Sequence, residues 1–303
     1  MLHNTDTESQ VNIEFHADDF ALFPAQSQRI LDFHTHGRLN GTSIFPNSPY
    51  LDECMALLRP YEDELALTVH LNLIEGQSVC PPEEVPLLVT KEGVFNNSFG
   101  GLLFHSLFWK RRAYKEQIKK EFCAQIRAVK QRLEKNGSLR LDGHAHYHML
   151  PVAFDALMEL IQEQELDVSY IRIPAEYPML YIKNWRKLKD ISIINFAKVL
   201  ILNILAARNE RKYASLLQPL QRKLFLGVFL SGRMHRDNVN SILPDAVALA
   251  AEKGWDIEIL SHPGGVFEAE DAAKITCRPD IAFLTSEYRK KEASLFLHEE
   301  VRV

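Results

Sequence analysis

Three histidines stand at alternate positions in the stretch from Asp142 to Pro151, as His144, His146 and His148. In an extended strand every second side chain points to the same face, so this spacing predicts three imidazoles directed at one point. Imidazole is a common ligand of divalent metals, and Pro151 bars further strand pairing. The pattern therefore predicts a metal site. The alternative is a half-buried strand end whose histidines only form hydrogen bonds.

Two adjacent carboxylates, Asp18 and Asp19, end an alternating apolar and polar segment that begins at Val11. The alternation predicts a strand over residues 11–20 with the pair at its C-terminal end. Neighbouring side chains of a strand diverge, so one carboxylate can hold a metal while the other faces the reacting group. The alternative for Asp19 is an N-cap of the helix predicted over residues 24–34.

Polar residues also lie near the ends of other predicted strands. On its own, a histidine in an apolar strand is more often a core residue with a satisfied hydrogen bond. Six such residues at predicted strand ends indicate a functional site, because polar residues with separate structural roles have no reason to share that position. The six are Asp18, Asp19, His70, His144, Arg172 and His262.

Helices or loops separate the predicted strands, and no hairpin signal joins two of them. This order predicts an α/β fold with a parallel sheet, open or closed into a barrel, whose C-terminal strand ends carry the chemistry. Besides the histidine stretch, strands are expected at residues 11–20, 42–45, 64–73, 168–174, 224–230 and 256–264. Helices are expected at residues 24–34, 50–59, 104–135, 152–164, 191–208 and 239–253.

Two connecting segments carry specific expectations. The helix over residues 104–135 should end at Asn136-Gly137 in a left-handed stop. The segment over residues 77–101 is rich in Pro, Gly and Asn and should form a long loop of the kind that covers a binding site.

The composition is that of an ordinary globular protein: 303 residues, 46% hydrophobic and 25% charged, enough for one large core and one or two domains. The formal net charge of -5 argues against nucleic acid or an anionic membrane as the main partner. The basic runs at 110–112 and 119–120 are interpreted as solvated helix faces. The most apolar run, residues 191–207, is too short and interrupted to span a bilayer, and a homodimer could form through it.

The cysteines Cys54, Cys80, Cys123 and Cys277 are widely spaced and form no C-x-x-C pair. They indicate neither a zinc ribbon nor a disulfide framework, so reduced thiols in a cytoplasm are expected. Residues 1–10 are polar and lack the order of a secretion signal, which argues against export.

Four ordered segments carry a resemblance to a known family. They read His-Ala-Asp-Asp-Phe at 16–20, Val-His-Leu-Asn-Leu-Ile-Glu-Gly at 69–76, Asp-Gly-His-Ala-His-Tyr-His-Met-Leu-Pro at 142–151 and Ser-His-Pro-Gly at 261–264. In these segments the chain resembles the YdjC-like (ChbG) carbohydrate deacetylases, over about residues 11 to 290. The resemblance implies a distorted (β/α) barrel of the glycoside hydrolase/deacetylase type. It also implies removal of N-acetyl groups from chitooligosaccharide-type substrates with a divalent metal.

The resemblance assigns roles to individual residues. Carried over to this chain, the metal ligands are Asp19, His70 and His144, the catalytic base is Asp18, and His262 is a candidate acid or substrate contact. The whole chain, 1–303, would be a single domain with its core at 10–290 and a helical insertion at about 177–221. Ala21 replaces the family's usual glycine, so the turn after the first strand need not adopt a positive φ.

Hydrolysis of an acetamide requires activation of both reactants, because the amide is a poor electrophile and water is a poor nucleophile. The hypothesis is that Asp18 accepts the proton of water, the metal stabilises the oxyanion and His262 protonates the leaving amine. Arg172 would hold Asp18 ionised and oriented, or alternatively form a salt bridge that closes the barrel. The mixed carboxylate and imidazole donors suit Zn²⁺ or Mg²⁺ and also admit Mn²⁺ or Co²⁺.

Some assignments stay open. His146 and His148 are interpreted as residues behind the metal ligands, as sugar contacts or as packing. A metal-dependent phosphoesterase is a second function, although Arg172 is the only cation among the six strand-end residues. A non-catalytic sugar-binding protein is a third, against which the intact Asp18-Asp19 pair argues.

Overall fold

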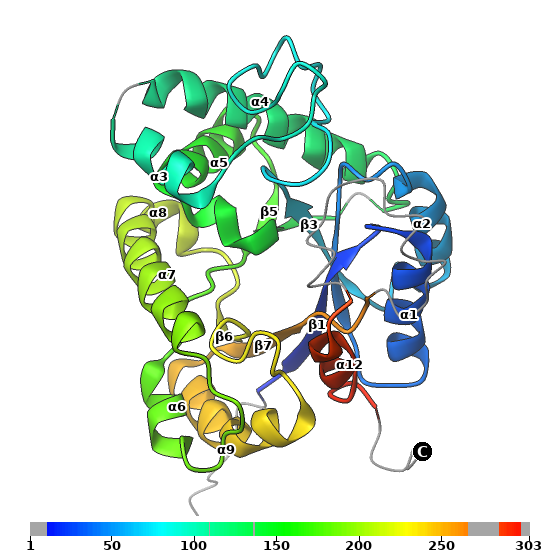
Figure 1. Cartoon of the computed structure of the whole chain (residues 1–303), viewed down its shortest axis with the longest axis vertical. Coiled ribbons are helices and arrows are strands. Elements are labelled where there is room, and N and C mark those ends of the chain that lie inside the picture. Colours follow the sequence, from blue (N-terminus) through cyan, green and yellow to red (C-terminus); the bar gives the residue numbers. More distant parts are fainter. Residues whose placement is uncertain (1–10, 109, 136, 266–284, 298–303) are drawn as a thin grey trace, which may run out of the picture.

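The computed structural model describes residues 11–108, 110–135, 137–265 and 285–297. Its seven strands form one sheet in the order β5-β4-β3-β2-β1-β7-β6, with every paired strand parallel. The sheet curls into an open half-barrel whose edges are β5 and β6 (Figure 1). The distorted parallel α/β barrel expected from the sequence is confirmed. The strands are β1 (Ile13–Phe20), β2 (Gly41–Ile44), β3 (Ala66–Leu71), β4 (Leu139–Gly143), β5 (Val168–Ile171), β6 (Lys223–Leu226) and β7 (Asp256–Ser261).

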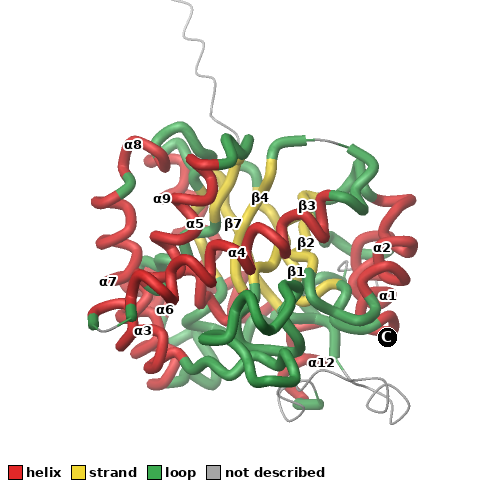
Figure 2. The backbone as a smooth tube through the Cα atoms, turned by 90° about the horizontal axis from the view of Figure 1, so that it is seen from above, coloured by secondary structure: helices red, strands yellow, loops and turns green. Residues whose placement is uncertain are grey.

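The helices surround the strands, which lie at the centre of the molecule (Figure 2). Those on the N-terminal half are α1 (Pro24–Thr35), α2 (Leu51–Leu58), η1 (Arg59–Tyr61), α3 (Phe99–Leu107) and α4 (Arg111–Lys130). Those that follow are η2 (His144–Met149), α5 (Pro151–Glu163), α6 (Pro178–Asn184), α7 (Ile193–Lys212), α8 (Ala214–Leu217), α9 (Arg236–Lys253) and α12 (Glu287–Ala293). The helical segment expected at about 177–221 therefore contains α6, α7 and α8.

The apolar core lies between the helices and the outer face of the sheet. Ile30 of α1, Val129 of α4, Leu157 of α5 and Ile242 of α9 are completely buried there. Burial of such a side chain stabilises the fold by about 1.5–3 kcal/mol relative to exposure. This layer holds the strands in place and so positions their C-terminal ends.

The inner face of the half-barrel is polar instead. Glu14, His16 and Asp18 alternate along β1 and point to this face, and all three are buried. Glu14 accepts hydrogen bonds from Arg140 of β4 and forms an ion pair with Lys223 of β6. The curl of the sheet thus encloses charges that pair across strands.

The helix expected over residues 104–135 is in fact two helices, so that expectation was wrong. α3 begins at Phe99, where the Ser98 hydroxyl accepts from the Gly101 N–H, and it ends at Leu107. α4 starts after Lys110, whose φ of 65° is left-handed. The break lets both helices pack on α5. α4 ends at Lys130 rather than at Asn136, which lies outside the described residues, as do Cys277 and residues 1–10.

The three histidines do not share one strand face, so the extended conformation expected for them was wrong. β4 ends at Gly143, and η2 follows with positive φ at Ala145 (48°) and His146 (60°). A Cβ on Gly143 would lie 2.6 Å from Nδ1 of His148, so the turn needs glycine there. The chain folds back over its own strand end and sends the three imidazoles in different directions.

None of the helices in the described ranges is long and apolar enough to cross a membrane.

Candidate active site

Three candidate ligands meet at the C-terminal edge of the sheet. Asp19 is in β1, His70 is in β3 and His144 follows β4. Oδ1 of Asp19 lies 3.1 Å from Nδ1 of His144 and 3.5 Å from Nε2 of His70, and those two nitrogens are 3.3 Å apart. One carboxylate oxygen and two imidazole nitrogens therefore converge, a donor set that fits a divalent cation with further coordination positions open.

Each candidate histidine ligand is fixed by a carboxylate on its far nitrogen. Nδ1 of His70 lies 2.7 Å from Oδ1 of Asp142, and Nε2 of His144 lies 3.2 Å from Oε1 of Glu75. Such partners fix the tautomer and ring orientation of metal-ligating histidines. The sequence contained Asp142 and Glu75 within the quoted segments, but nothing in their spacing indicated this role.

The carboxylates around the cluster create a negative electrostatic potential. Burial opposes the protonated form of His70, but the nearby Asp142 and Asp18 carboxylates outweigh it and raise its pKa to about 9. Burial likewise opposes protonation of His144, and Glu75 and Asp19 nevertheless raise its pKa. Hydrogen bonds from both histidines hold the pKa of Asp19 well below its usual value despite burial. A field that attracts protons to the two rings also attracts a metal cation.

Asp18 points to the side of the cluster where Arg172 and His262 lie. Nη1 of Arg172 donates to both carboxylate oxygens of Asp18, at 3.0 and 3.1 Å. The same guanidinium pairs with Asp142 at 2.5 Å and with Glu258 at 2.5 Å. Both sequence interpretations of Arg172 therefore fit its contacts, because it orients Asp18 and joins the ends of β4, β5 and β7.

His262, directly after β7, lies beside Asp18 on the neighbouring strand β1, with its Nε2 4.0 Å from Oδ2 of Asp18. Glu292 of α12 accepts from the His262 backbone N–H at 2.8 Å and lies 3.7 Å from Nδ1 of the ring. Arg289 of the same helix donates to the His262 carbonyl at 3.1 Å and lies 3.5 Å from Oδ2 of Asp19. No pattern in the sequence indicated α12, whose residues reach the site only through tertiary packing.

His146 and His148 do not join the cluster. Nε2 of His148 bonds to the Arg172 carbonyl at 2.8 Å, and burial lowers the pKa of this histidine to about 4. The His146 ring packs edge-on against Phe225, 5.8 Å between centroids, and burial lowers its pKa as well. Of the roles left open for the pair, packing of the turn is the one their contacts fit.

The turn after β1 is left-handed, although an alanine at position 21 did not require a positive φ. Ala21 has φ 71° and Asp19 has φ 68°. The Ala21 N–H donates to Oγ of Ser27, and Nε2 of Gln26 donates to the Asp19 carbonyl. The N-cap interpretation of Asp19 was also wrong, because the N-cap of α1 is Phe23, without a side-chain bond.

A buried chain of polar side chains continues below the cluster, and sequence reasoning missed it. Nε2 of His16 bonds to Oγ of Ser43 at 2.7 Å, and this hydroxyl donates to Oδ2 of Asp142 at 2.5 Å. Glu14 bonds to the other nitrogen of His16 at 2.7 Å. The polar alternation of Glu14, His16 and Asp18 in the first strand was the available signal.

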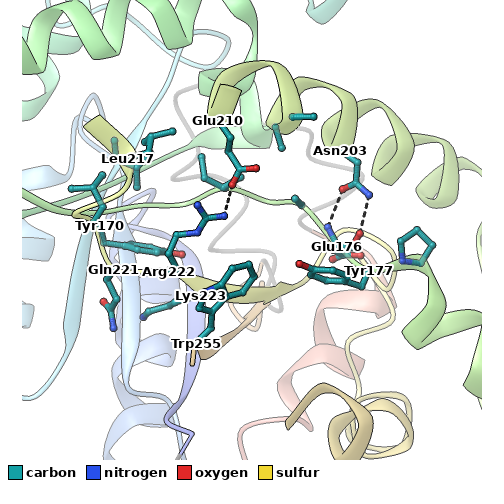
Figure 3. Close-up of a pocket in the computed structure, with 17 residues that line it drawn as sticks. Tyr170, Glu176, Tyr177, Asn203, Glu210, Leu217, Gln221, Arg222, Lys223 and Trp255 are labelled. Atoms are coloured by element: carbon teal, nitrogen blue, oxygen red, sulfur yellow. Dashed lines mark hydrogen bonds and ion pairs between the residues drawn. The ribbon is translucent and has the colours of Figure 1, made fainter. Parts of the chain in front are cut away.

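Two of the cavities in the described part of the chain lie apart from this cluster. One, of about 280 Å³, opens between the edge strands beside α7 (Figure 3). Tyr177 and Trp255 line it, and Arg222 pairs with Glu210 across it. The other, of about 940 Å³, lies between the long loop and α4. None of the six strand-end residues lines either cavity, so the candidate chemistry belongs to the cluster.

The chain is similar in sequence to known proteins. A model of the family described as YdjC-like protein matches residues 12–303. A carbohydrate deacetylase of Enterococcus faecalis is 33% identical over 120 residues, which cover 39% of this chain and 43% of that protein. A carbohydrate deacetylase of Thermoanaerobacter pseudethanolicus is 28% identical over 153 residues, 50% of this chain and 57% of that protein. The chain thus spans about half the length of these curated relatives.

A solved structure shares the fold over most of the chain. It is that of an Enterococcus faecalis V583 protein named as a candidate cellobiose-phosphate cleavage protein, with a TM-score of 0.63 and 21% identity. The match covers 96% of this chain and 92% of that one. At this identity the likeness supports the fold alone.

Proposed function

Because the chain belongs to the YdjC-like protein family, we propose that it is a metal-dependent hydrolase that removes N-acetyl groups from an acetylated amino sugar or chitooligosaccharide. Curated relatives carry the name carbohydrate deacetylase, and one from Proteus mirabilis is named chitooligosaccharide deacetylase. The observation that carries the proposal is the convergence of Asp19, His70 and His144 beside Asp18. We also propose the single domain over 1–303.

Asp19, His70 and His144 would hold the cation, which is Zn²⁺ or Mg²⁺, or alternatively Mn²⁺ or Co²⁺. When bound, a divalent cation polarises the acetamide carbonyl and makes water more acidic. Glu75 and Asp142 keep the two imidazoles turned toward the site.

Asp18 is the proposed base and His262 the proposed acid. Water adds to the acetyl carbonyl carbon and gives a proton to Asp18, whose carboxylate Arg172 orients. The carbon–nitrogen bond then breaks, and His262 gives a proton to the leaving nitrogen, so the products are acetate and the free amine. His262 follows β7, the strand next to β1, and its Nε2 lies 4.0 Å from Oδ2 of Asp18, so both groups are close enough to exchange protons with one bound amide.

The test is acetate release by metal-stripped protein resupplied in turn with Mg²⁺, Zn²⁺, Mn²⁺ or Co²⁺. Substrates are diacetylchitobiose, its longer homologues and their phosphorylated forms. Acetate that appears only with metal is the expected result. Phosphate release without acetate would instead favour the phosphoesterase, and no product from any substrate would favour a binding protein.

The variant Asp18→Asn tests whether Asp18 acts as the general base rather than as a metal ligand. We expect kcat to fall about 10²–10⁴-fold, the usual contribution of a general base, with metal content unchanged. Elemental analysis and acetate release measure the two quantities. Full activity of this variant would remove Asp18 from the mechanism.

We also propose a cytoplasmic location. Within the described ranges, Cys54, Cys80 and Cys123 are free thiols, as expected for a reducing compartment.

A further inference from the structure

Aliphatic side chains cover the outward side of α7. Ile193 is 85% exposed and Ile194 and Ile204 are each 70% exposed, and Leu200 and Ile201 stand between them. Lys or Glu would favour the helix more at exposed positions, because Ile is β-branched and is stabilised by burial rather than by water. The outer side of α7 thus has the composition of a face that is covered.

The same kind of surface continues onto α6. Met179 and, just after the helix, Trp185 are 67% and 61% exposed. Phe229 contacts both helices, because its ring stacks on Tyr181 of α6 and packs edge-on against Phe196 of α7. Both views place α6 and α7 on the same side of the molecule (Figures 1 and 2).

The end of α3 borders this surface at the other end of α7. Phe104, Leu107 and Phe108 are all more than half exposed. Arg111, at the start of α4, and Arg208 of α7 both pair with Asp155, so the junction of α3 and α4 adjoins the C-terminal part of α7. We call the outward residues of α3, α6 and α7, with residue 108 and residues 110–112 and 185–192, the apolar-basic surface.

Its charges are predominantly positive, although the whole chain has a net charge of -5. Residues 99–112 contain Lys110, Arg111 and Arg112 and no acidic residue. In residues 177–209 Asp190 is the only acidic residue, against the cations Lys183, Arg186, Lys187, Lys189, Lys198 and Arg208. Some of these cations pair with carboxylates of other elements, such as Lys183 with Asp245.

We propose that the apolar-basic surface binds the surface of an anionic lipid bilayer. Its aliphatic and aromatic side chains enter the interface, Trp185 lies at the level of the headgroups, and the Lys and Arg side chains contact lipid phosphates. The homodimer suggested by the sequence is disfavoured, because a two-fold contact through this surface brings like charges together. The net charge of the chain is a poor guide here because the cations are gathered on one side.

The helix α7, which carries most of this surface, lies at the rim of the candidate active site. Asn195 of α7 donates to the Phe229 and Ser231 carbonyls after β6, and Asn209 donates to the Met149 carbonyl after β4. α7 therefore crosses the open side of the half-barrel near the C-terminal strand ends. A bilayer on this surface would bring headgroups close to the cluster. The substrate class that follows, resting on the proposed deacetylase function, is an N-acetylated amino sugar linked to a lipid.

Co-sedimentation of the full chain with vesicles tests the docking without any activity. The vesicles are phosphatidylcholine alone and phosphatidylcholine with a third of it replaced by phosphatidylglycerol. We expect at least about tenfold tighter binding to the anionic vesicles, weakening with salt. Ile194→Asp combined with Ile201→Asp should reduce this binding about tenfold, whereas Val79→Asp, an exposed position on the long loop, should not.

Several outcomes would overturn the docking: no binding to anionic vesicles at low salt, equal binding by the double variant, or a dimer in light scattering that the double variant dissociates. The last would assign the surface to a second copy.

For the substrate, acetate release is compared between a soluble acetylated amino sugar and a lipid-linked one in vesicles. The double variant should slow only the latter. If neither substrate releases acetate, the deacetylase function is rejected, but the vesicle-binding result still stands. If the double variant and the natural chain hydrolyse the lipid-linked substrate at the same rate, the lipid-linked substrate is rejected.

Discussion

At the residue scale, the candidate site is made of imidazoles that carboxylates turn toward a common point. His70 presents Nε2 and His144 presents Nδ1, because Asp142 and Glu75 hold the opposite nitrogens. The two rings lie edge to face, with centroids 5.3 Å apart. Without these two carboxylates each ring could turn and present its other nitrogen or its CH edge.

Glu75→Gln tests this orientation. The amide keeps the size of the side chain but not its charge, so we expect metal affinity to fall about tenfold or more. Titration calorimetry of the metal-stripped protein measures the affinity. Glu92→Gln, on the same long loop and exposed, is the matched control and should bind metal like the natural chain. Equal affinity in both variants would show that Glu75 does not act on His144.

Glu292 gives a pH dependence of stability whose sign can be worked out. Burial raises the pKa of Glu292 to about 7 from its ordinary value of 4.5. The folded state therefore holds this proton to a higher pH than the unfolded state, and the contribution to folding free energy is lost as pH rises from about 4.5 to 7. The change is at most about 3 kcal/mol.

Urea unfolding between pH 4 and 8 measures that loss. We expect Glu292→Gln to flatten this part of the pH profile, because glutamine does not titrate. A variant that loses stability with pH as steeply as the natural chain would contradict a proton on Glu292.

At the element scale, the end of β1 determines where the two carboxylates point. Both aspartates lie in β1, but Asp19 has a left-handed φ of 68°, which turns its side chain away from that of Asp18. Ser27 and Gln26 of α1 bond to the backbone of this turn. The left-handed conformation separates two adjacent side chains more than an extended strand would, so Asp19 reaches His144 while Asp18 reaches Arg172.

Ala21→Gly should relieve strain in that turn. A left-handed residue other than glycine costs about 1–2 kcal/mol, and the greater freedom of glycine in the unfolded chain offsets part of it. We expect a net stabilisation of about 0.5–1 kcal/mol in urea unfolding, with metal affinity unchanged. Ala25→Gly, inside α1, is the matched control and should destabilise by about 0.5–1 kcal/mol. Destabilisation by Ala21→Gly would mean that the turn carries no such strain.

At the scale of the whole molecule, one guanidinium forms ion pairs with carboxylates of three strands on the inner face of the half-barrel. Arg172 is completely buried and pairs with Asp18, Asp142 and Glu258, which come from β1, β4 and β7. These carboxylates repel one another without it. The arrangement positions the base and also compensates buried negative charge across the sheet.

Arg172→Met should therefore destabilise the protein strongly. Removal of one partner from a buried ion-pair network costs about 3–5 kcal/mol. Arg132→Met, which breaks an ion pair with the exposed Asp52, is the control and should cost about 1 kcal/mol or less. Chemical unfolding of both variants at neutral pH makes the comparison, and equal small losses would contradict a structural role for Arg172.

The sequence by itself determined the class of fold and the set of strand-end residues. Alternating patterns and missing hairpin signals are local features, and parallel strands bring their C-terminal ends together wherever such strands occur. For this reason the sequence alone predicts one edge of the sheet for Asp18, Asp19, His70, His144, Arg172 and His262, and all six lie there.

Only the tertiary structure decided the directions and partners of those side chains. The histidine stretch alternates as a strand would, yet close packing at Gly143 and two left-handed residues turn the chain, so His146 and His148 leave the cluster. Glu75 comes from a loop and Glu292 from a distant helix, and no sequence period connects either with its histidine. Contacts between residues far apart in sequence depend on how the elements pack, and local patterns do not contain that information.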